Sequence, residues 1–282
     1  MKSKLLLFIT AAIWGFAFVA QRAGMEFLDP FVFNGIRFAL GALFLGIVTK
    51  TLPFRGFSKS WYLGIVLFVA ASLQQYGLVW TTAGSAGFIT GLYVVFVPLM
   101  GIFLKQKVRP MIWISVSLAV CGLYMISNNQ SIEINLGNAL VLISAIFWAL
   151  HVQLIDRLVQ RVEAFEIAMN QFVVCSILSI VNAIVLNVFI RPNPLGIELW
   201  KNVSAAWLPL LYGGLLSVGI AYSLQVYAQK HTNPTTAALI LCSESLFALL
   251  GGFWLLHETV SISMVVGAAL LLVSMLLSLR HH

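Results

Sequence analysis

Apolar residues gather along this chain in long uninterrupted segments, and charged residues fall almost entirely between them. A helix of about 20 apolar residues is long enough to cross the hydrocarbon core of a bilayer. Proline, asparagine and charged residues interrupt the pattern, as at Asp29-Pro30, Arg109-Pro110 and Asn233-Pro234. The pattern predicts ten transmembrane helices, over residues 5–20, 31–49, 61–81, 85–104, 111–127, 136–154, 165–189, 205–228, 235–256 and 262–279.

Composition agrees with this pattern. The chain has 282 residues, of which 61% are hydrophobic and 9% are charged, whereas soluble domains carry about 25% charged residues. The first apolar segment is not followed by a small-residue cleavage site and a soluble domain, so we expect it to be a retained span. The fold class predicted is therefore an all-α polytopic membrane protein.

The basic residues predict an orientation. If the N-terminus is inside and the spans alternate, twelve of the sixteen Lys and Arg residues fall in inside loops, three fall outside, and Arg37 lies within a span. Cytoplasmic loops carry an excess of Lys and Arg. We therefore expect both termini in the cytoplasm of a multi-pass protein of the cytoplasmic (inner) cell membrane. One missed span would reverse every later loop, so the asymmetry also supports the count.

The ten spans divide into two groups of five, residues 1–130 and 131–282. Residues 80–108 align without gaps on residues 232–260, and Trp14-Gly15 in the first span has a counterpart in Trp148-Ala149 in the sixth. Because five is odd, a second repeat must enter the membrane from the opposite side. Inverted repeats of this kind place a binding cavity at their interface near the bilayer midplane.

The whole chain resembles the drug/metabolite transporter (DMT) superfamily, in its EamA family. The residues that carry this resemblance are Trp14-Gly15, Asp29-Pro30-Phe31 followed by Arg37, the turn at residues 81–88, and Glu244 followed fourteen residues later by Glu258. Three positions depart from the pattern, where Ser245 replaces a common proline, His257 a common glycine and Gln106 a common glutamate. The resemblance implies a ten-span metabolite exporter whose cavity is lined by the first, third, fourth, sixth, eighth and ninth spans.

Glu244 is the leading candidate for chemistry. It lies twelve residues after Thr232, hence ~18 Å into the ninth span at 1.5 Å per residue. A carboxylate near the midplane costs at least ~2.5 kcal/mol. We expect Glu244 to face the cavity, either coupling to protons or pairing with a substrate ammonium. The alternative is a structural carboxyl that hydrogen-bonds to neighbouring Ser or Thr.

Arg37 must also find a partner within the bundle. Its role is either structural, in an ion pair or by extension of the side chain to the membrane interface, or the binding of a substrate carboxylate. Trp14 and Trp148 lie at equivalent mid-depth places in the two repeats and could form opposite walls of a cavity. His151 follows Trp148 by three residues and shares its helix face. The set expected to line the cavity combines aromatic and polar side chains: Trp14, Phe18, Gln74, Tyr76, Thr90, Tyr93, Trp148, His151, Tyr222, Gln225, Glu244 and Phe247.

A proline inside the fourth span, Pro98, predicts a kink there. The three cysteines Cys121, Cys175 and Cys242 have no metal-binding spacing, so we expect packing residues, no metal and no cofactor.

The function expected is a secondary transporter, not an enzyme, that exports amino acids or related amphipathic and aromatic compounds by alternating access. The chain contains no HExxH motif and no pair of central carboxylates for an intramembrane enzyme, and no GxxxxGK[ST] loop for ATP. The expected partners are a small-molecule substrate and the lipid bilayer, with protons as a candidate coupling ion and no nucleic acid. The expected assembly is a monomer or a weak homodimer. The alternatives are a flippase for a lipid or lipid-linked conjugate, a downhill facilitator, and a channel or scaffold.

Overall fold

The computed structural model describes residues 2–126, 135–187, 197–256 and 259–280, and the regular elements in these ranges are all helices. In the first half they are α1 (Lys2–Gly24), α2 (Pro30–Thr49), α3 (Phe57–Trp80), α4 (Ala83–Gly91), α5 (Tyr93–Phe103) and α6 (Pro110–Ile126). In the second half they are α7 (Leu136–Leu158), α8 (Ala164–Val185), α9 (Ile197–Ala205), α10 (Trp207–Leu211), the π-helix η2 (Tyr212–Tyr222), α11 (Ser223–Gln229), α12 (Pro234–Leu241), α13 (Glu244–Leu256) and α14 (Ile262–Arg280).

The expected membrane-spanning class is confirmed. Within the described ranges, nine helical segments are long and apolar enough to cross a membrane, and the shorter helix Pro110–Ile126 accounts for the fifth expected segment. Helix α9 was not expected. Residues 127–134, which include the expected boundary between the two halves, lie outside the described residues, as do His257 and Glu258.

The polar residues that interrupt the apolar pattern cap the helices. The Asp29 carboxylate accepts the Phe31 N–H at 2.8 Å, and Pro30 is the first residue of α2. The Asn233 side chain accepts the Thr236 N–H at 2.8 Å at the start of α12. These bonds satisfy N–H groups that have no partner inside the helix. The same residues that predicted the segment ends therefore fix where the helices begin.

Two spans are interrupted near their middle. The fourth divides at Leu92 into α4 and α5, and the ninth divides at Cys242 and Ser243 into α12 and α13. Leu92 and Cys242 have nearly the same backbone angles, with φ near −61° and ψ near −12°. The interruption of the fourth span lies six residues before Pro98, where we expected a kink, and α5 continues through that proline.

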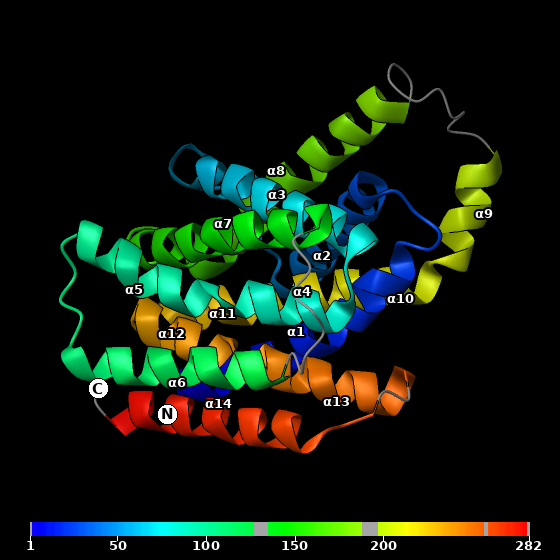
Figure 1. Ribbon diagram of the computed structural model, residues 1–282. Helices are drawn as coiled ribbons and strands as arrows, with labels where there is room; N and C mark the ends of the chain where they lie inside the picture. The colour runs from blue at the N-terminus through cyan, green and yellow to red at the C-terminus, as the bar shows by residue number, and fades with distance from the viewer. Residues whose placement is uncertain (1, 127–134, 188–196, 257–258, 281–282) are drawn as a thin grey trace.

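Both ends of the described chain lie at one end of the bundle (Figure 1). There Lys4 Nζ donates a hydrogen bond to the Leu279 carbonyl at 3.3 Å. We call this end the terminal face and the opposite end the distal face. The loops that follow α2, α5, α7 and α11 also lie at the terminal face (Figure 1), so it collects the basic loop residues of the charge pattern.

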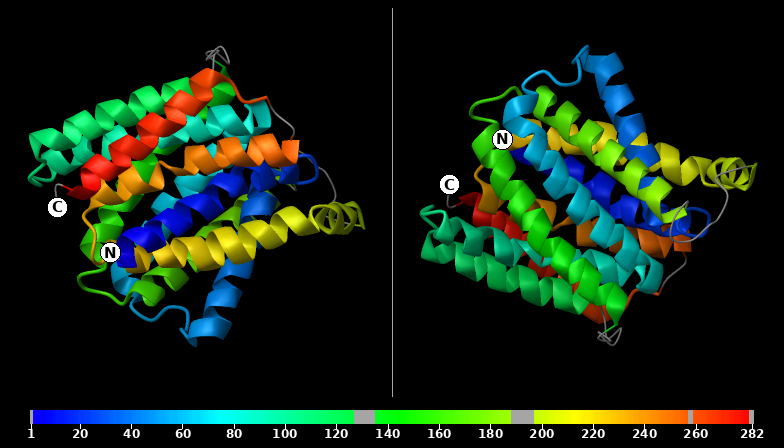
Figure 2. Two further views of the ribbon diagram at one scale, coloured as in Figure 1. Left: turned by 90° about the horizontal axis from the view of Figure 1, so that it is seen from below. Right: turned by 90° about the horizontal axis from the view of Figure 1, so that it is seen from above.

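The contacts between the first five spans and the last five are mirrored. Helix α2 packs against α8, and α6 packs against α14. The third span, α3, contacts the sixth, α7, in the same way that the eighth span, η2 and α11, contacts the first, α1. The broken span α4–α5 lies on α7, and the broken span α12–α13 lies on α1 (Figure 2). The two interrupted helices therefore face the centre of the bundle from two sides.

Candidate functional site

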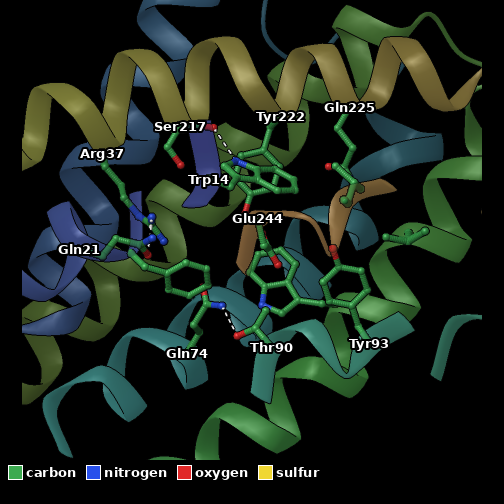
Figure 3. Close-up of a pocket in the computed structure, with 14 residues that line it drawn as sticks. Trp14, Gln21, Arg37, Gln74, Thr90, Tyr93, Ser217, Tyr222, Gln225 and Glu244 are labelled. Atoms are coloured by element: carbon green, nitrogen blue, oxygen red, sulfur yellow. Dashed lines mark hydrogen bonds between the residues drawn. The ribbon is translucent and has the colours of Figure 1, made fainter. Parts of the chain in front are cut away.

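A central pocket with an empty volume of about 480 Å³ lies between the two halves (Figure 3). Its walls come from the first, third, fourth, sixth, eighth and ninth spans, together with one residue of the second. The lining residues are Trp14, Phe18, Gln21, Arg37, Gln74, Thr90, Tyr93, Trp148, Val152, Ser217, Tyr222, Gln225, Leu241 and Glu244.

Glu244 stands directly after the interruption of the ninth span, as the first residue of α13. Its side chain is 3% exposed, and among the described residues its Oε1 atom has no hydrogen-bond partner. The Tyr93 hydroxyl, from α5, lies close enough to interact with this carboxyl but also lacks a hydrogen bond of ordinary geometry. The pocket thus contains a buried carboxyl group whose hydrogen-bonding capacity the protein leaves partly unused.

Close packing against α1 fixes the position of Glu244. A side-chain carbon added at Gly15 would overlap the Glu244 carbonyl oxygen and the Phe247 Cβ atom. The absence of a side chain at Gly15 lets the two helix backbones touch. At the next residue of α13, the Ser245 hydroxyl donates to the Gly87 carbonyl of α4 at 3.1 Å. The carboxyl is therefore held between two helices rather than placed on a loop.

Arg37 also lines this pocket and lies beside Gln21, to the left of Glu244 in Figure 3. It is 2% exposed, its Nη1 donates to Gln21 Oε1 and its Nε donates to Asn34 Oδ1, both at 2.9 Å. The guanidinium also lies 4.9 Å from the centre of the Phe38 ring. Within the described ranges Arg37 has no carboxylate within 4.0 Å, and it is buried rather than extended toward an interface.

An aromatic group lines the same pocket. Tyr222 packs between the two tryptophans, with ring centres 4.5 Å from Trp14 and 6.0 Å from Trp148. The Trp14 indole N–H donates to the Ser217 carbonyl of η2 at 3.1 Å. The Trp148 indole N–H has no partner in the described part of the chain. The pocket therefore combines flat apolar walls with an unused hydrogen-bond donor.

Three residues of the expected set lie behind the pocket wall. His151 is fully buried, and its Nε2 atom lies 2.7 Å from Gln171 Oε1 on α8. Its ring contacts the edges of Trp148 and Tyr222, so it supports the aromatic group from outside the pocket. Over the ranges that the structure describes, no group of three His, Cys, Asp or Glu side chains is placed to hold a metal ion.

Tyr76 and Phe247 are the other two. Tyr76 contacts Phe31 and Trp80 on the far side of α3 from the pocket residue Gln74. Phe247 packs its ring against Phe8 of α1 at 5.3 Å. Both side chains are packing residues in this structure.

Besides Arg37, which was considered separately, four lining residues were not in the expected set. Gln21 follows Phe18 by three residues and so shares a helix face with it, and Val152 follows Trp148 by four. These spacings of three and four residues could have identified Gln21 and Val152 from the sequence. Ser217 precedes Tyr222 by five residues, a separation that brings two side chains together only in a π-helix. The fourth, Leu241, is the last residue before the interruption of the ninth span.

The sequence is similar to transporters along its length. A profile of the EamA-like transporter family matches residues 1–128 and 135–280. An "uncharacterized transporter" of Archaeoglobus fulgidus is 30% identical over 97% of this chain and 85% of its own. The "uncharacterized transporter YoaV" of Bacillus subtilis is 22% identical over 92% of this chain and 90% of its own. A protein of known crystal structure superposes on 99% of this chain and 97% of its own, with a TM-score of 0.78 and 16% identity, which shows the shared fold.

Proposed function

The chain belongs to the EamA-like transporter family, and we propose that it is a secondary transporter that exports small zwitterionic metabolites, amino acids or related aromatic compounds, across the cytoplasmic membrane. Family membership makes it a multi-pass membrane transporter and not an enzyme. The substrate class, the direction of transport and the coupling to protons are our proposal.

The observation that carries the proposal is a pocket with one buried acidic and one buried basic side chain that do not pair with each other. Glu244 and Arg37 both line it, and in the described residues the one ion pair within 4.0 Å joins Arg55 and Glu166 elsewhere. A buried charge is costly unless it is paired. A zwitterion supplies both missing partners, because its ammonium group suits Glu244 and its carboxylate suits Arg37.

The rest of the lining fits the same substrate. Trp14, Trp148 and Tyr222 offer flat apolar surface for a side chain, and the free Trp148 indole N–H offers one donor. Aromatic side chains combine a large apolar area with a polar group at one edge. An amphipathic or aromatic amino acid would therefore use both the charged groups and the walls.

Protons are the coupling ion that we propose. When the ammonium group leaves, Glu244 is left buried without a cationic partner. Uptake of a proton from the opposite side would neutralise it and allow the empty carrier to return. This assignment makes Glu244 both the substrate-binding group and the coupling group.

Alternating access is proposed from the internal repetition. The mirrored contacts of the two groups of five spans and their equivalent interruptions support inverted repeats over residues 1–130 and 131–282. In such carriers the two repeats rock around a site near the midplane. The basic loops at the terminal face support a cytoplasmic location for both termini.

The test is radiolabelled amino-acid efflux from proteoliposomes, with and without a pH gradient. We expect efflux that the gradient accelerates, and a loss of at least tenfold in Glu244→Gln. Glu26→Gln, an exposed acid outside the pocket, is the matched control and should transport normally. Full activity of Glu244→Gln at every pH would remove Glu244 from the mechanism. Efflux without any effect of the gradient would indicate a downhill facilitator, and translocation of labelled lipid instead would indicate a flippase.

A further inference from the structure

A second hollow opens at the terminal face, with an empty volume of about 1080 Å³. Its walls come from the segment that follows α5, from the end of α7 and from the start of α12, and they include Gln106, Asp156 and Thr235. These three elements end or begin side by side at the terminal face (Figure 1). The hollow shares no lining residue with the central pocket.

The layer between the two cavities is thin. On α7, Val152 lines the central pocket and Asp156 lines the hollow. They are four residues apart on one helix face, which corresponds to a rise of ~6 Å. On α12, Leu241 lines the pocket and Thr235 lines the hollow, a rise of ~9 Å. One to two helical turns therefore separate the cavities.

Two glutamines form hydrogen bonds beside this layer: Gln106 lines the hollow, and Gln153 follows the pocket residue Val152 on α7. Gln153 is fully buried, and its Nε2 atom donates to the Val97 carbonyl of α5 at 2.8 Å. Gln106 Nε2 donates to Gln153 Oε1 at 2.8 Å, and Gln153 Nε2 donates back to Gln106 Oε1 at 3.3 Å. The reciprocal pair therefore joins α7, one residue beyond the pocket residue Val152, to the segment after α5 at the wall of the hollow.

We propose that the hollow is the terminal-side mouth of the transport path and that the Gln106–Gln153 pair is the gate between this mouth and the central pocket. The proposal rests on the transport function proposed above. Both groups are neutral amides, and Gln106 lines the polar hollow, so water that enters there can replace the hydrogen bonds of the pair. A gate of this kind opens without separating charges, while the carbonyl of Val97 and the amide of Gln153 become available to a passing polar substrate.

Thiol labelling tests the gate without any substrate. The three native cysteines are replaced by alanine, Val152→Cys is introduced as a reporter in the pocket, and a membrane-impermeant maleimide is applied from the terminal face of sealed vesicles. Lys59→Cys, at an exposed position on the terminal side of α3, reports the sidedness of each vesicle preparation. We expect slow labelling of Val152→Cys, and a rise of at least tenfold when Gln153→Leu is added.

Two further variants keep the experiment decisive. Gln106→Leu breaks the same hydrogen bonds from the other, half-buried side chain, so it should raise the labelling rate of Val152→Cys by the same factor. It replaces Gln153→Leu if that variant does not fold. Asn182→Leu is the matched control, because within the described residues the Asn182 side chain donates to the Leu178 carbonyl of its own helix, and labelling should not change. Unchanged labelling in both glutamine variants, or fast labelling of the unmodified pair, overturns the gate. Because the readout needs no flux, failure of the gate is distinct from failure of amino-acid efflux.

Discussion

Replacing Arg37 by methionine is predicted to separate substrates that carry a carboxylate from those that do not. Methionine keeps an unbranched apolar stem like that of arginine but removes the guanidinium donors. A hydrogen bond to a charged group contributes about 1.5–3 kcal/mol, and each 1.36 kcal/mol is a factor of ten. The KM of Arg37→Met for an amino acid should therefore rise about 10- to 150-fold.

The matching amine, which lacks the carboxylate, provides the internal comparison. It makes no contact with Arg37, so its KM should change by less than about threefold. Both compounds are measured in proteoliposomes made from the folded, monodisperse fraction, because the variant also leaves the Gln21 and Asn34 side-chain oxygens without their donor. That loss costs about 1–3 kcal/mol per group and should lower the melting temperature without changing the ratio of the two KM values.

Arg22→Met is the control, since Arg22 lies in the last turn of α1 and does not line the pocket. It should leave both KM values unchanged. An equal rise in the KM for amino acid and amine in Arg37→Met, or no rise for either, would refute a carboxylate-binding role. Arg37 would then have a structural role only.

Three further predictions concern packing and surface charge, each measured as a melting temperature in detergent. Gly15→Ala forces α1 away from the backbone of α13, which should cost about 1–3 kcal/mol and lower the melting temperature by several degrees. Gly84→Ala is the control, because no neighbouring element comes within 4 Å of the new carbon, and it should not lower the melting temperature. An equal melting temperature for the two variants would argue against the contact between α1 and α13. Glu166→Gln breaks the ion pair with the exposed Arg55 and should cost no more than about 1 kcal/mol. A large drop in the melting temperature would contradict the view that this is a weak surface ion pair. Gly267→Leu should separate α14 from α6, where the backbones touch, and a stability equal to that of the parent would show that this contact is dispensable.

The spans were predictable because a bilayer leaves few alternatives. Backbone groups in lipid must be satisfied within a helix, so long apolar segments become helices. Their ends were marked by residues such as Asp29 and Asn233, which cap the helices that follow. The interruptions at Leu92 and Cys242 were not predicted, because neither point of division carries a proline. Gly91 precedes the first and Ser243 follows the second, but an isolated residue of this kind is also tolerated inside a continuous helix.

Helix geometry explains which site residues could be predicted. Glu244 and Arg37 stood out because a charge at depth is rare in an apolar span. Gln74 and Tyr76 are two residues apart, hence about 200° apart around a helix, so they could not line one pocket, and Tyr76 lies outside. Ser217 could not be found because no residue pattern in the eighth span marks the π-helical spacing that places it beside Tyr222.

Thermal stabilisation of the purified protein by a panel of free amino acids, with the matching amines and acids, tests the central claim most directly, because a ligand that binds the folded state raises the melting temperature. The pocket around Glu244 and Arg37 predicts that at least one amino acid raises it by several degrees. The same compound should have no effect on Glu244→Gln. An equal rise in Glu244→Gln, or a panel in which no amino acid raises the melting temperature of the parent, would contradict the account.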